Sequence, residues 1–330
     1  MTEKTHQQAY LAASSLPTSH DHHLKRVYEA MQNGRDEITA IEELPHKRHA
    51  YEGHPDFQPV DHSQLNTDHS EQDDVNSHHH HDEDSHPHPD SIPSTFLPGG
   101  RKSLPGISMR AFCLGLALGL TSSLSLFLTV HTALWRAPAF IALLSLFHFL
   151  EFWTTAQCNT SQANTSAYLL TSNGSAYNIA HSAAMLEFLI SHYFGLSFVN
   201  AWVPQRYKYV PLAIGVLLLL VGQTTRSLAM AQAGTNFNHH VQTKHATGHE
   251  LVTDGIYAWL RHPSYFGFFW WGLGTQLLLG NSVCFMGYTL VLWRFFKGRI
   301  RLEEKFLVAF FGKEYKDYRS KTWTGIPFIP

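Results

Sequence analysis

Apolar residues gather in the C-terminal two thirds of the chain, in long runs that are nearly free of charge. Four of these runs approach the roughly 20 residues that cross a hydrocarbon core about 30 Å thick. They cover residues 111–130, 139–156, 180–203 and 209–231. A fifth run, residues 264–296, is too long for one crossing, and Gly280 and Asn281 near its middle are a turn signal. The pattern predicts an all-α, polytopic membrane protein with about six transmembrane helices, the last two forming a tight hairpin.

The N-terminal third has the opposite pattern. Residues 1–105 hold fifteen of the 24 histidines and no apolar run long enough to bury a core, so this leader is predicted to be disordered. The tract "HHHHDEDSHPHPD" at residues 78–90 contains residue types that bind metals, but ordering it around an ion would cost conformational entropy. We favour a solvated tract and predict no metal site. No signal peptide opens the chain, so the leader is expected on the cytosolic side.

Charge predicts the orientation of the spans. Six crossings put both termini on one side of the membrane, and the positive-inside rule makes the basic side cytosolic. Arg206 and Lys208 on the other side mildly oppose this orientation. The sequons at Asn159, Asn164 and Asn173 would then lie in a cytosolic loop, where glycosylation does not occur. The basic residues of the last stretch are Arg294, Lys297, Arg299, Arg301, Lys305, Lys313, Lys316, Arg319 and Lys321.

Polar residues of the membrane half concentrate in a connector, residues 236–265, and in the closing segment from residue 298 onward. In the closing segment Arg299 and Glu303 stand at i and i+4, so they share a helix face. An exposed pair of this kind contributes only about 0.3–0.5 kcal/mol. At the end of a span, where a polar connector can meet it, a charged pair is instead a functional candidate. We therefore predict four spans within residues 106–235, followed by a catalytic region at residues 236–330.

Residues 107–330 resemble the isoprenylcysteine carboxyl methyltransferases, in the six-span form of the fungal members. The matching blocks, in order, are "SLFHFLEFWTTA", "GTNFNHHVQ", "HELVTDGIYAWLRHPSYFGFFWWGLGTQLLLGN", "WRFF" and "RLEEKFLVAFFGKEYKDYRSKTWTGIPFIP". The resemblance implies methyl esterification, with S-adenosylmethionine, of the C-terminal carboxylate of a prenylated cysteine. It also implies a pocket for the cofactor on the cytosolic side of the endoplasmic reticulum membrane. The implied partners are the bilayer and CaaX-processed proteins such as small GTPases, without nucleic acid.

Carried over by motif, Arg299 and Glu303 are the catalytic candidates, and Arg299 would bind the substrate. The residues that would bind the cofactor are Gln242, His249, Glu250, Leu251, Val252, Tyr257, His262, Pro263, Ser264, Tyr265 and Glu303. An α-carboxyl group has a pKa near 3.5 and is already ionised at neutral pH, so neither histidine is assigned as a general base. Arg261 is left open between a structural role and contact with a carboxylate or cofactor group. Pro263 is expected to begin the fifth span.

Three alternatives compete with this hypothesis. Two are related membrane enzymes, a phospholipid methyltransferase and a sterol reductase that uses NADPH. Binding of NADPH without S-adenosylmethionine would favour the reductase. The third is a transporter, which predicts inverted repeats and charges near the middle of the bilayer. The sequence shows no inverted repeat, and its charges lie at the ends of the spans rather than near their middle.

Overall fold

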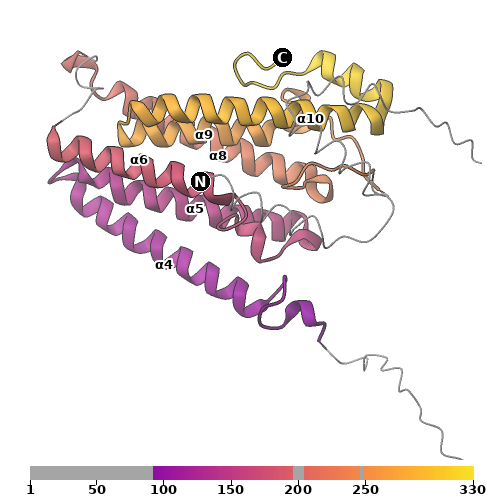
Figure 1. The fold of residues 1–330 in the computed structure, drawn as a ribbon, viewed down its shortest axis with the longest axis horizontal. Coiled ribbons are helices and arrows are strands. Elements are labelled where there is room, and N and C mark those ends of the chain that lie inside the picture. The colour runs from indigo at the N-terminus through magenta and orange to yellow at the C-terminus, as the bar shows by residue number, and fades with distance from the viewer. Residues whose placement is uncertain (1–91, 196–203, 246–247) are drawn as a thin grey trace, which may run out of the picture. The chain divides into compact units, whose positions relative to one another are not determined.

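The computed structural model describes residues 92–195, 204–245 and 248–330, and the chain there is helical (Figure 1). Apart from one isolated bridge between Leu260 and Trp323, these residues contain no β-structure, so the all-α prediction is confirmed for them. The leader that was predicted to be disordered, with its histidine tract, lies outside the described residues as far as residue 91. The principal helices are α4 (Leu104–Thr129), α5 (Arg136–Cys158), α6 (Gly174–Phe194), α8 (Val210–Ala233), α9 (Pro263–Leu279) and α10 (Val283–Lys321).

The first helix begins earlier than its apolar run suggests. A short 3-10 helix, Ser94–Phe96, precedes it, and α4 starts at Leu104 rather than at residue 111. The Ser103 hydroxyl caps α4 by accepting from the Gly106 N–H at 3.2 Å, and Pro105 occupies the first turn, where its missing N–H costs nothing. The helix therefore begins before the predicted span, because capping residues and not hydropathy set its start, and the boundary of the crossing itself stays a prediction.

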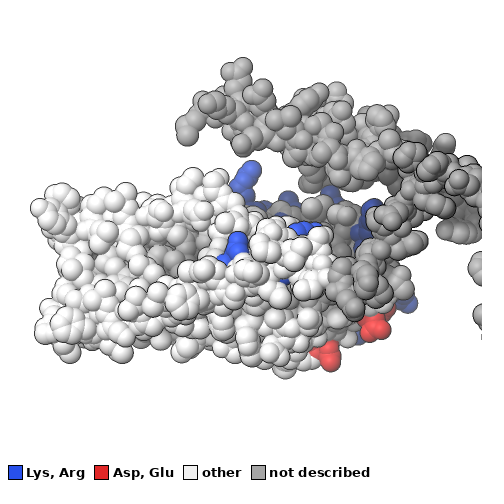
Figure 2. Space-filling view, turned by 90° about the horizontal axis from the view of Figure 1, so that it is seen from below, with Lys and Arg blue, Asp and Glu red and all other residues white. Residues whose placement is uncertain are grey.

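Three helical segments are long and apolar enough to cross a membrane, judged within the described residues: Leu104–Thr129, Ala133–Cys158 and Gln205–Asn236. The count of six stays a prediction, because α9 has 17 residues, about 25 Å of helix, and α6 carries Glu187 between two histidines. Figure 2 shows Lys, Arg, Asp and Glu gathered toward one end of the molecule, with the rest of its described surface on that face free of them. Such a surface suits contact with lipid.

The third predicted span is shifted. Helix α6 begins at Gly174 and ends at Phe194, so the prediction of one helical span over residues 180–203 is wrong at its C-terminal end. Gly195 ends the helix with a φ of 67°, a left-handed conformation that glycine adopts at low cost. The last eight residues of the predicted span lie outside the described residues.

The predicted hairpin is confirmed, and its second arm continues as a helix beyond residue 296, as the shared helix face of Arg299 and Glu303 required. Gly280 turns the chain after α9 with a φ of 80°, and Pro263 occupies the first turn of α9 as predicted. Helix α10 does not end at residue 296 but continues to Lys321, so the second hairpin arm and the helix expected after it form one element. The single break in α10 is at Gly312, whose φ of 56° and ψ of −120° exclude most side chains.

Glycines bring α8 and α9 into the most extensive helix contact of the bundle. A Cβ atom on Gly222 would lie 2.6 Å from the Gly267 carbonyl oxygen, and one on Gly267 would lie 2.6 Å from the Gly222 carbonyl oxygen. Gly215 and Gly274 form a second such pair, closer to the hairpin turn. Small residues let two backbones approach this closely. The packing fixes the start of α9 beside the end of α8.

The last nine residues fold back against α9 and α10. The Arg261 N–H donates to the Trp323 carbonyl at 2.9 Å, and the Trp270 and Trp293 indoles donate to the Gly325 and Pro327 carbonyls. Buried Ile326 and Ile329 join the main core. The connector and the tail therefore meet at one end of the bundle, as the sequence predicted.

Candidate active site

A cavity lies where the end of α8, the connector, the start of α9 and α10 converge; we call it the connector cavity. Polar groups of the connector face aromatic and apolar residues of α10, including Leu307 and Phe311. Every residue predicted to bind the cofactor lines it except Gln242. These are His249, Glu250, Leu251, Val252, Tyr257, His262, Pro263, Ser264, Tyr265 and Glu303.

Gln242 lines a smaller cavity that adjoins the connector cavity. The two cavities share Asn236, Asn238, His249 and Glu303 as walls, so Gln242 lies beside the predicted group and not apart from it. The connector is anchored here because the Asn236 side chain accepts from the Glu250 N–H at 3.0 Å.

The Tyr265 hydroxyl links the two catalytic candidates. It donates to Glu303 Oε2 at 2.6 Å and accepts from Arg299 Nε at 2.8 Å. Arg299 and Glu303 share one face of α10, as predicted, but they are joined through this hydroxyl instead of by a direct ion pair. The Tyr265 ring also stacks on His262 at 5.5 Å and lies 5.3 Å from the Arg299 guanidinium carbon.

Arg299 does not line the connector cavity. It lines a neighbouring cavity, the Arg299 cavity, with His239, His240 and Phe295, and it donates to the His239 carbonyl. Phe237 and Asn238 of the connector line both cavities. Arg299 and Tyr265 therefore lie between the connector cavity and the Arg299 cavity. In this position they can orient two ligands that bind in separate cavities.

Arg261 binds a carboxylate and the tail. Its Nε donates to Glu304 Oε1 at 2.6 Å, and its other nitrogens donate to the Thr322 and Pro330 carbonyls. Burial alone would raise the pKa of Glu304, but hydrogen bonds and charge from His262 and Arg261 outweigh it and hold the pKa at about 2. Arg261 thus contacts a carboxylate and ties the connector to α10 and to the tail, and it also lines the connector cavity, so both roles left open for it remain compatible with its position.

Besides Tyr265, three further tyrosines line the connector cavity. The Tyr257 hydroxyl donates to the Ala229 carbonyl at 3.1 Å, and the Tyr318 hydroxyl donates to the Tyr257 carbonyl at 2.7 Å. The Tyr315 hydroxyl is buried and has no hydrogen-bond partner in the described part of the chain. Burial raises the pKa of all three hydroxyl groups, so they remain protonated donors at neutral pH.

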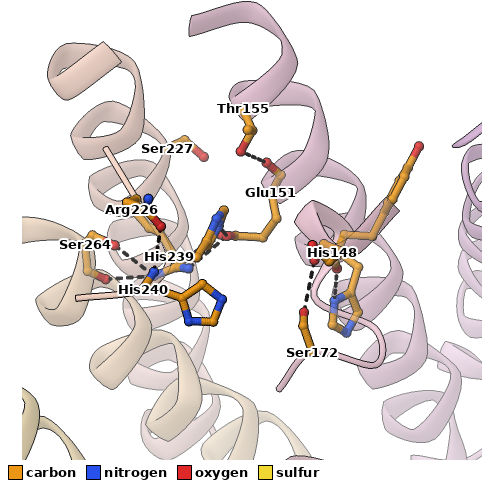
Figure 3. Close-up of polar contacts among 12 residues, drawn as sticks. His148, Glu151, Thr155, Ser172, Arg226, Ser227, His239, His240 and Ser264 are labelled. Carbon is orange, nitrogen blue, oxygen red and sulfur yellow. Dashed lines mark hydrogen bonds and ion pairs between the residues drawn. The ribbon is translucent and has the colours of Figure 1, made fainter. Parts of the chain in front are cut away.

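A buried ionic network behind the site was missed by the sequence analysis (Figure 3). Glu151 of α5 accepts from Arg226 of α8 through both carboxylate oxygens, one of them at 2.8 Å, and from His239 Nε2 of the connector at 3.0 Å. Arg226 also donates to the Ser264 hydroxyl at 2.9 Å. The network fixes the first turn of α9, which supplies part of the cavity wall.

The sequence carried a signal for this network. Glu151 and Arg226 each stand alone in an otherwise apolar span, and charges within spans are costly unless paired. Pairing them needed knowledge that α5 packs against α8, which neither sequence separation nor the connector motif provides.

The loop between α5 and α6 takes part in the same end of the bundle. Asn159, one of the three sequon asparagines, is buried and donates to the Thr235 and Phe237 carbonyls at 3.4 and 3.0 Å. This amide is committed to the connector, so Asn159 is not accessible for glycosylation in the folded protein.

Comparison with known proteins gives one consistent result. The model of the isoprenylcysteine carboxyl methyltransferase family matches residues 214–309. A protein-S-isoprenylcysteine O-methyltransferase of Saccharomyces cerevisiae is 41% identical over 254 residues, covering 76% of this chain and 100% of the relative. The enzyme of the same name from Schizosaccharomyces pombe is 45% identical, covering 68% of this chain and 97% of the relative. The Homo sapiens enzyme is 38% identical over 68% of this chain and 75% of its own length.

A solved structure also matches. It is described as the eukaryotic intramembrane Ras methyltransferase ICMT, and it is 38% identical with a TM-score of 0.61, covering 68% of this chain and 77% of that chain. The fungal relatives are covered almost completely and the human one by three quarters, as expected for the shorter fungal-like form. The alternatives of a phospholipid methyltransferase, a sterol reductase and a transporter receive no support from these matches.

Proposed function

This chain belongs to the isoprenylcysteine carboxyl methyltransferase family, and from that premise we propose how its residues divide the reaction between them. It is an integral membrane enzyme that methyl-esterifies the C-terminal carboxylate of prenylated cysteine. We assign the connector cavity to the methyl donor and the Arg299 cavity to the acceptor. The observation that carries this assignment is the Tyr265 hydroxyl, which joins Glu303 of the first cavity to Arg299 of the second.

The residues of the connector cavity fit S-adenosylmethionine. Glu303 offers a partly exposed carboxylate for an ammonium group, and Leu251, Val252 and Phe311 offer apolar walls for a nucleoside. The unpartnered Tyr315 hydroxyl offers a further donor. S-adenosylmethionine, when bound, supplies an electrophilic methyl group. The Tyr265 ring is already engaged by His262 and Arg299, so Tyr257 is the better candidate for a contact between an aromatic face and a cation.

Arg299 would bind and orient the acceptor carboxylate. Its guanidinium can hold a carboxylate by two parallel hydrogen bonds, which lysine cannot reproduce. The carboxylate is ionised without help, so no residue has to remove a proton. The work left to the protein is alignment, which contributes roughly 7–11 kcal/mol in favourable cases. The hydrogen bond to the Tyr265 hydroxyl holds the Arg299 side chain beside the connector cavity, which we assign to the donor.

The apolar spans explain why this reaction takes place in a membrane. A fifteen-carbon farnesyl chain partitions into lipid with about 0.8 kcal/mol per buried CH₂. Its cysteine carboxylate stays at the interface, where the polar end of the bundle lies. We propose that this end faces the cytosol in the endoplasmic reticulum membrane, with both termini cytosolic, because the basic closing segment lies there.

The assignment is tested with membranes that contain the full chain, labelled S-adenosylmethionine and a farnesylated cysteine peptide. We expect a base-labile methyl ester from the wild type. Arg299→Ala and Glu303→Ala are each expected to abolish it while the protein stays inserted in the membrane.

Two exposed residues of the same helix provide matched controls. Arg301→Ala and Glu314→Ala remove a cation and an anion from α10 without touching either cavity, so both variants should retain wild-type turnover. Normal turnover in Arg299→Ala or Glu303→Ala would exclude the assigned roles. A wild type that binds NADPH but not S-adenosylmethionine would exclude the reaction itself.

A further inference from the structure

A further cavity, lined by basic residues, lies at the end of the bundle opposite the active site. It is formed by the start of α5, the end of α6, the start of α8 and the hairpin turn after α9, and its polar lining includes Arg136, His192, Lys208 and Asn281. The connector cavity lies at the other end of α9, one helix of 17 residues and about 25 Å away. The two cavities are therefore separate sites.

Arg136 is the unusual residue of this cavity. It is half-buried, its Nε atom is buried without a hydrogen-bond partner in the described residues, and Nη1 reaches only the Leu279 carbonyl at 3.4 Å. Among the described residues that line the cavity there is no carboxylate. The guanidinium also lies 5.8 Å from the Trp135 ring centroid, but it has no anionic partner among the described residues. Partial burial without an anion costs free energy that a bound anionic ligand would offset.

The acidic side chain of α6, Glu187, already has other hydrogen-bond partners. Glu187 of α6 accepts from the Ser282, Val283 and Cys284 N–H groups at 2.8, 2.9 and 2.6 Å, so it caps α10 and does not neutralise Arg136.

The surroundings indicate the depth of the cavity in the membrane. Tyr193, Phe194, Tyr207 and Tyr209 are exposed around this end of the bundle. Exposed aromatic rings at the ends of apolar helices mark the boundary between hydrocarbon and headgroups. The cavity also has an apolar wall, to which Phe188, Leu212 and Leu277 contribute. A ligand here can place an anionic group on Arg136 and an aliphatic part against that wall.

From these observations we propose that the cavity binds the phosphate group of a membrane phospholipid, held chiefly by Arg136 with help from Lys208 and His192. Arginine matches phosphate through two parallel hydrogen bonds, and basic pockets between membrane helices suit lipid headgroups. The phospholipid would join α5 and α8 to the hairpin turn, and thereby stabilise the bundle at the end remote from catalysis.

The test measures thermal unfolding of the full chain, purified in a phospholipid-free detergent. A short-chain phosphatidic acid should raise the melting temperature in a saturable manner. The diacylglycerol with the same chains, which lacks the phosphate, and inorganic phosphate, which lacks the chains, should not. Arg136→Gln should weaken the apparent affinity for phosphatidic acid at least tenfold, and Lys208→Gln should weaken it several-fold.

Arg206→Gln is the matched control, because Arg206 belongs to the same aromatic rim, 4.7 Å from the Tyr207 ring centroid, but does not line the cavity. It should keep wild-type affinity. If Arg136→Gln does not fold, Lys208→Gln and His192→Gln carry the test. Unchanged affinity in the cavity variants, an equal loss in Arg206→Gln, or full stabilisation by inorganic phosphate would each overturn a phospholipid site. The readout is independent of methyl transfer, so it does not depend on the proposed function.

Discussion

At the scale of single residues, the tyrosines of the connector cavity differ in one respect that matters. Tyr257 and Tyr318 donate to carbonyls of their own protein, whereas the buried Tyr315 hydroxyl has no partner among the described residues. An unsatisfied buried polar group costs about 1–3 kcal/mol. A cavity ligand that accepts from Tyr315 would remove this cost.

Tyr315→Phe should therefore separate binding from stability. Without donor the variant should melt at the wild-type temperature or above it, because an unsatisfied hydroxyl has been removed. The KM for S-adenosylmethionine should rise about tenfold, the effect of losing roughly 1.4 kcal/mol of binding. Thermal unfolding without donor and initial rates over a range of donor concentrations measure the two effects.

Tyr318→Phe is the control for this prediction. It deletes a hydroxyl that is hydrogen-bonded to the Tyr257 carbonyl, so it should lower the melting temperature even without donor. A Tyr315→Phe variant that loses stability in the same way, or that keeps the wild-type KM, would contradict a role for the Tyr315 hydroxyl in donor binding.

Glu304 is expected to make the stability of the protein depend on pH. Its pKa in the folded protein is about 2, below the usual carboxyl value of 4.5, so the folded state holds the ionised form more strongly than the unfolded state does. This contribution is complete above about pH 4.5 and is lost as the pH falls toward 2. The melting temperature of Glu304→Gln should be well below that of the wild type at pH 6, and the gap should narrow below pH 4.5. A gap that is constant over this range would contradict the ion pair with Arg261.

At the scale of helices, α8 and α9 are held together by backbone contact, which only glycine allows. A Cβ atom on Gly267 would lie 2.6 Å from the Gly222 carbonyl oxygen and 2.8 Å from the Arg226 backbone nitrogen. Both contacts are with main-chain atoms, which cannot move aside as a flexible side chain would. Overpacking of this kind costs about 1–3 kcal/mol, more than the up to 1 kcal/mol that replacing a helix glycine gains in propensity.

Gly267→Val should therefore destabilise the bundle and, because it displaces the start of α9, should also raise the KM for the methyl donor. Thermal unfolding and initial rates measure both. Gly287→Ala is the control, since a Cβ atom on Gly287 meets nothing within 4 Å; this variant should be neutral or slightly more stable. Equal stability of Gly267→Val and the wild type would refute the packing argument.

Sequence patterns located helices better than they located helix ends. The hairpin and its Pro263 start were predictable, because glycine and proline act on the local backbone. The continuation of α10 beyond residue 296 was also expected from the helical spacing of Arg299 and Glu303, whereas its end at Lys321 was not predicted. The break at Gly312 could not be predicted, because the sequence does not show whether a glycine within a polar helix has helical or non-helical φ and ψ angles.

At the scale of the whole molecule, the site joins three parts of the chain that lie far apart in sequence. The connector residues could be predicted from their motif, and the pairing of Arg299 with Glu303 on one face followed from helical spacing. The contact of Glu151 with Arg226 depends on how α5 packs on α8, so composition and spacing could not predict it. This contact connects the membrane-embedded helices to the cavity, because Arg226 also holds Ser264 at the start of α9.

The network should behave as one unit when it is taken apart. Glu151→Met leaves the Arg226 charge buried without a carboxylate, and Arg226→Met leaves the buried Glu151 charge with His239 as its remaining partner in the network. Each single variant should therefore lose roughly 3–5 kcal/mol of stability. The double variant, Glu151→Met with Arg226→Met, buries no charge and should recover most of that loss, so the effects of the single changes should not add. The recovered protein should still bind the methyl donor poorly, because Ser264 has lost the guanidinium that fixes the turn from His262 to Tyr265.

Melting temperatures of the four proteins measure the coupling, and donor KM values of the folded ones measure the positioning. Additive losses would mean that the pair is not coupled, and a double variant with wild-type KM would mean that the network stabilises the bundle without shaping the site.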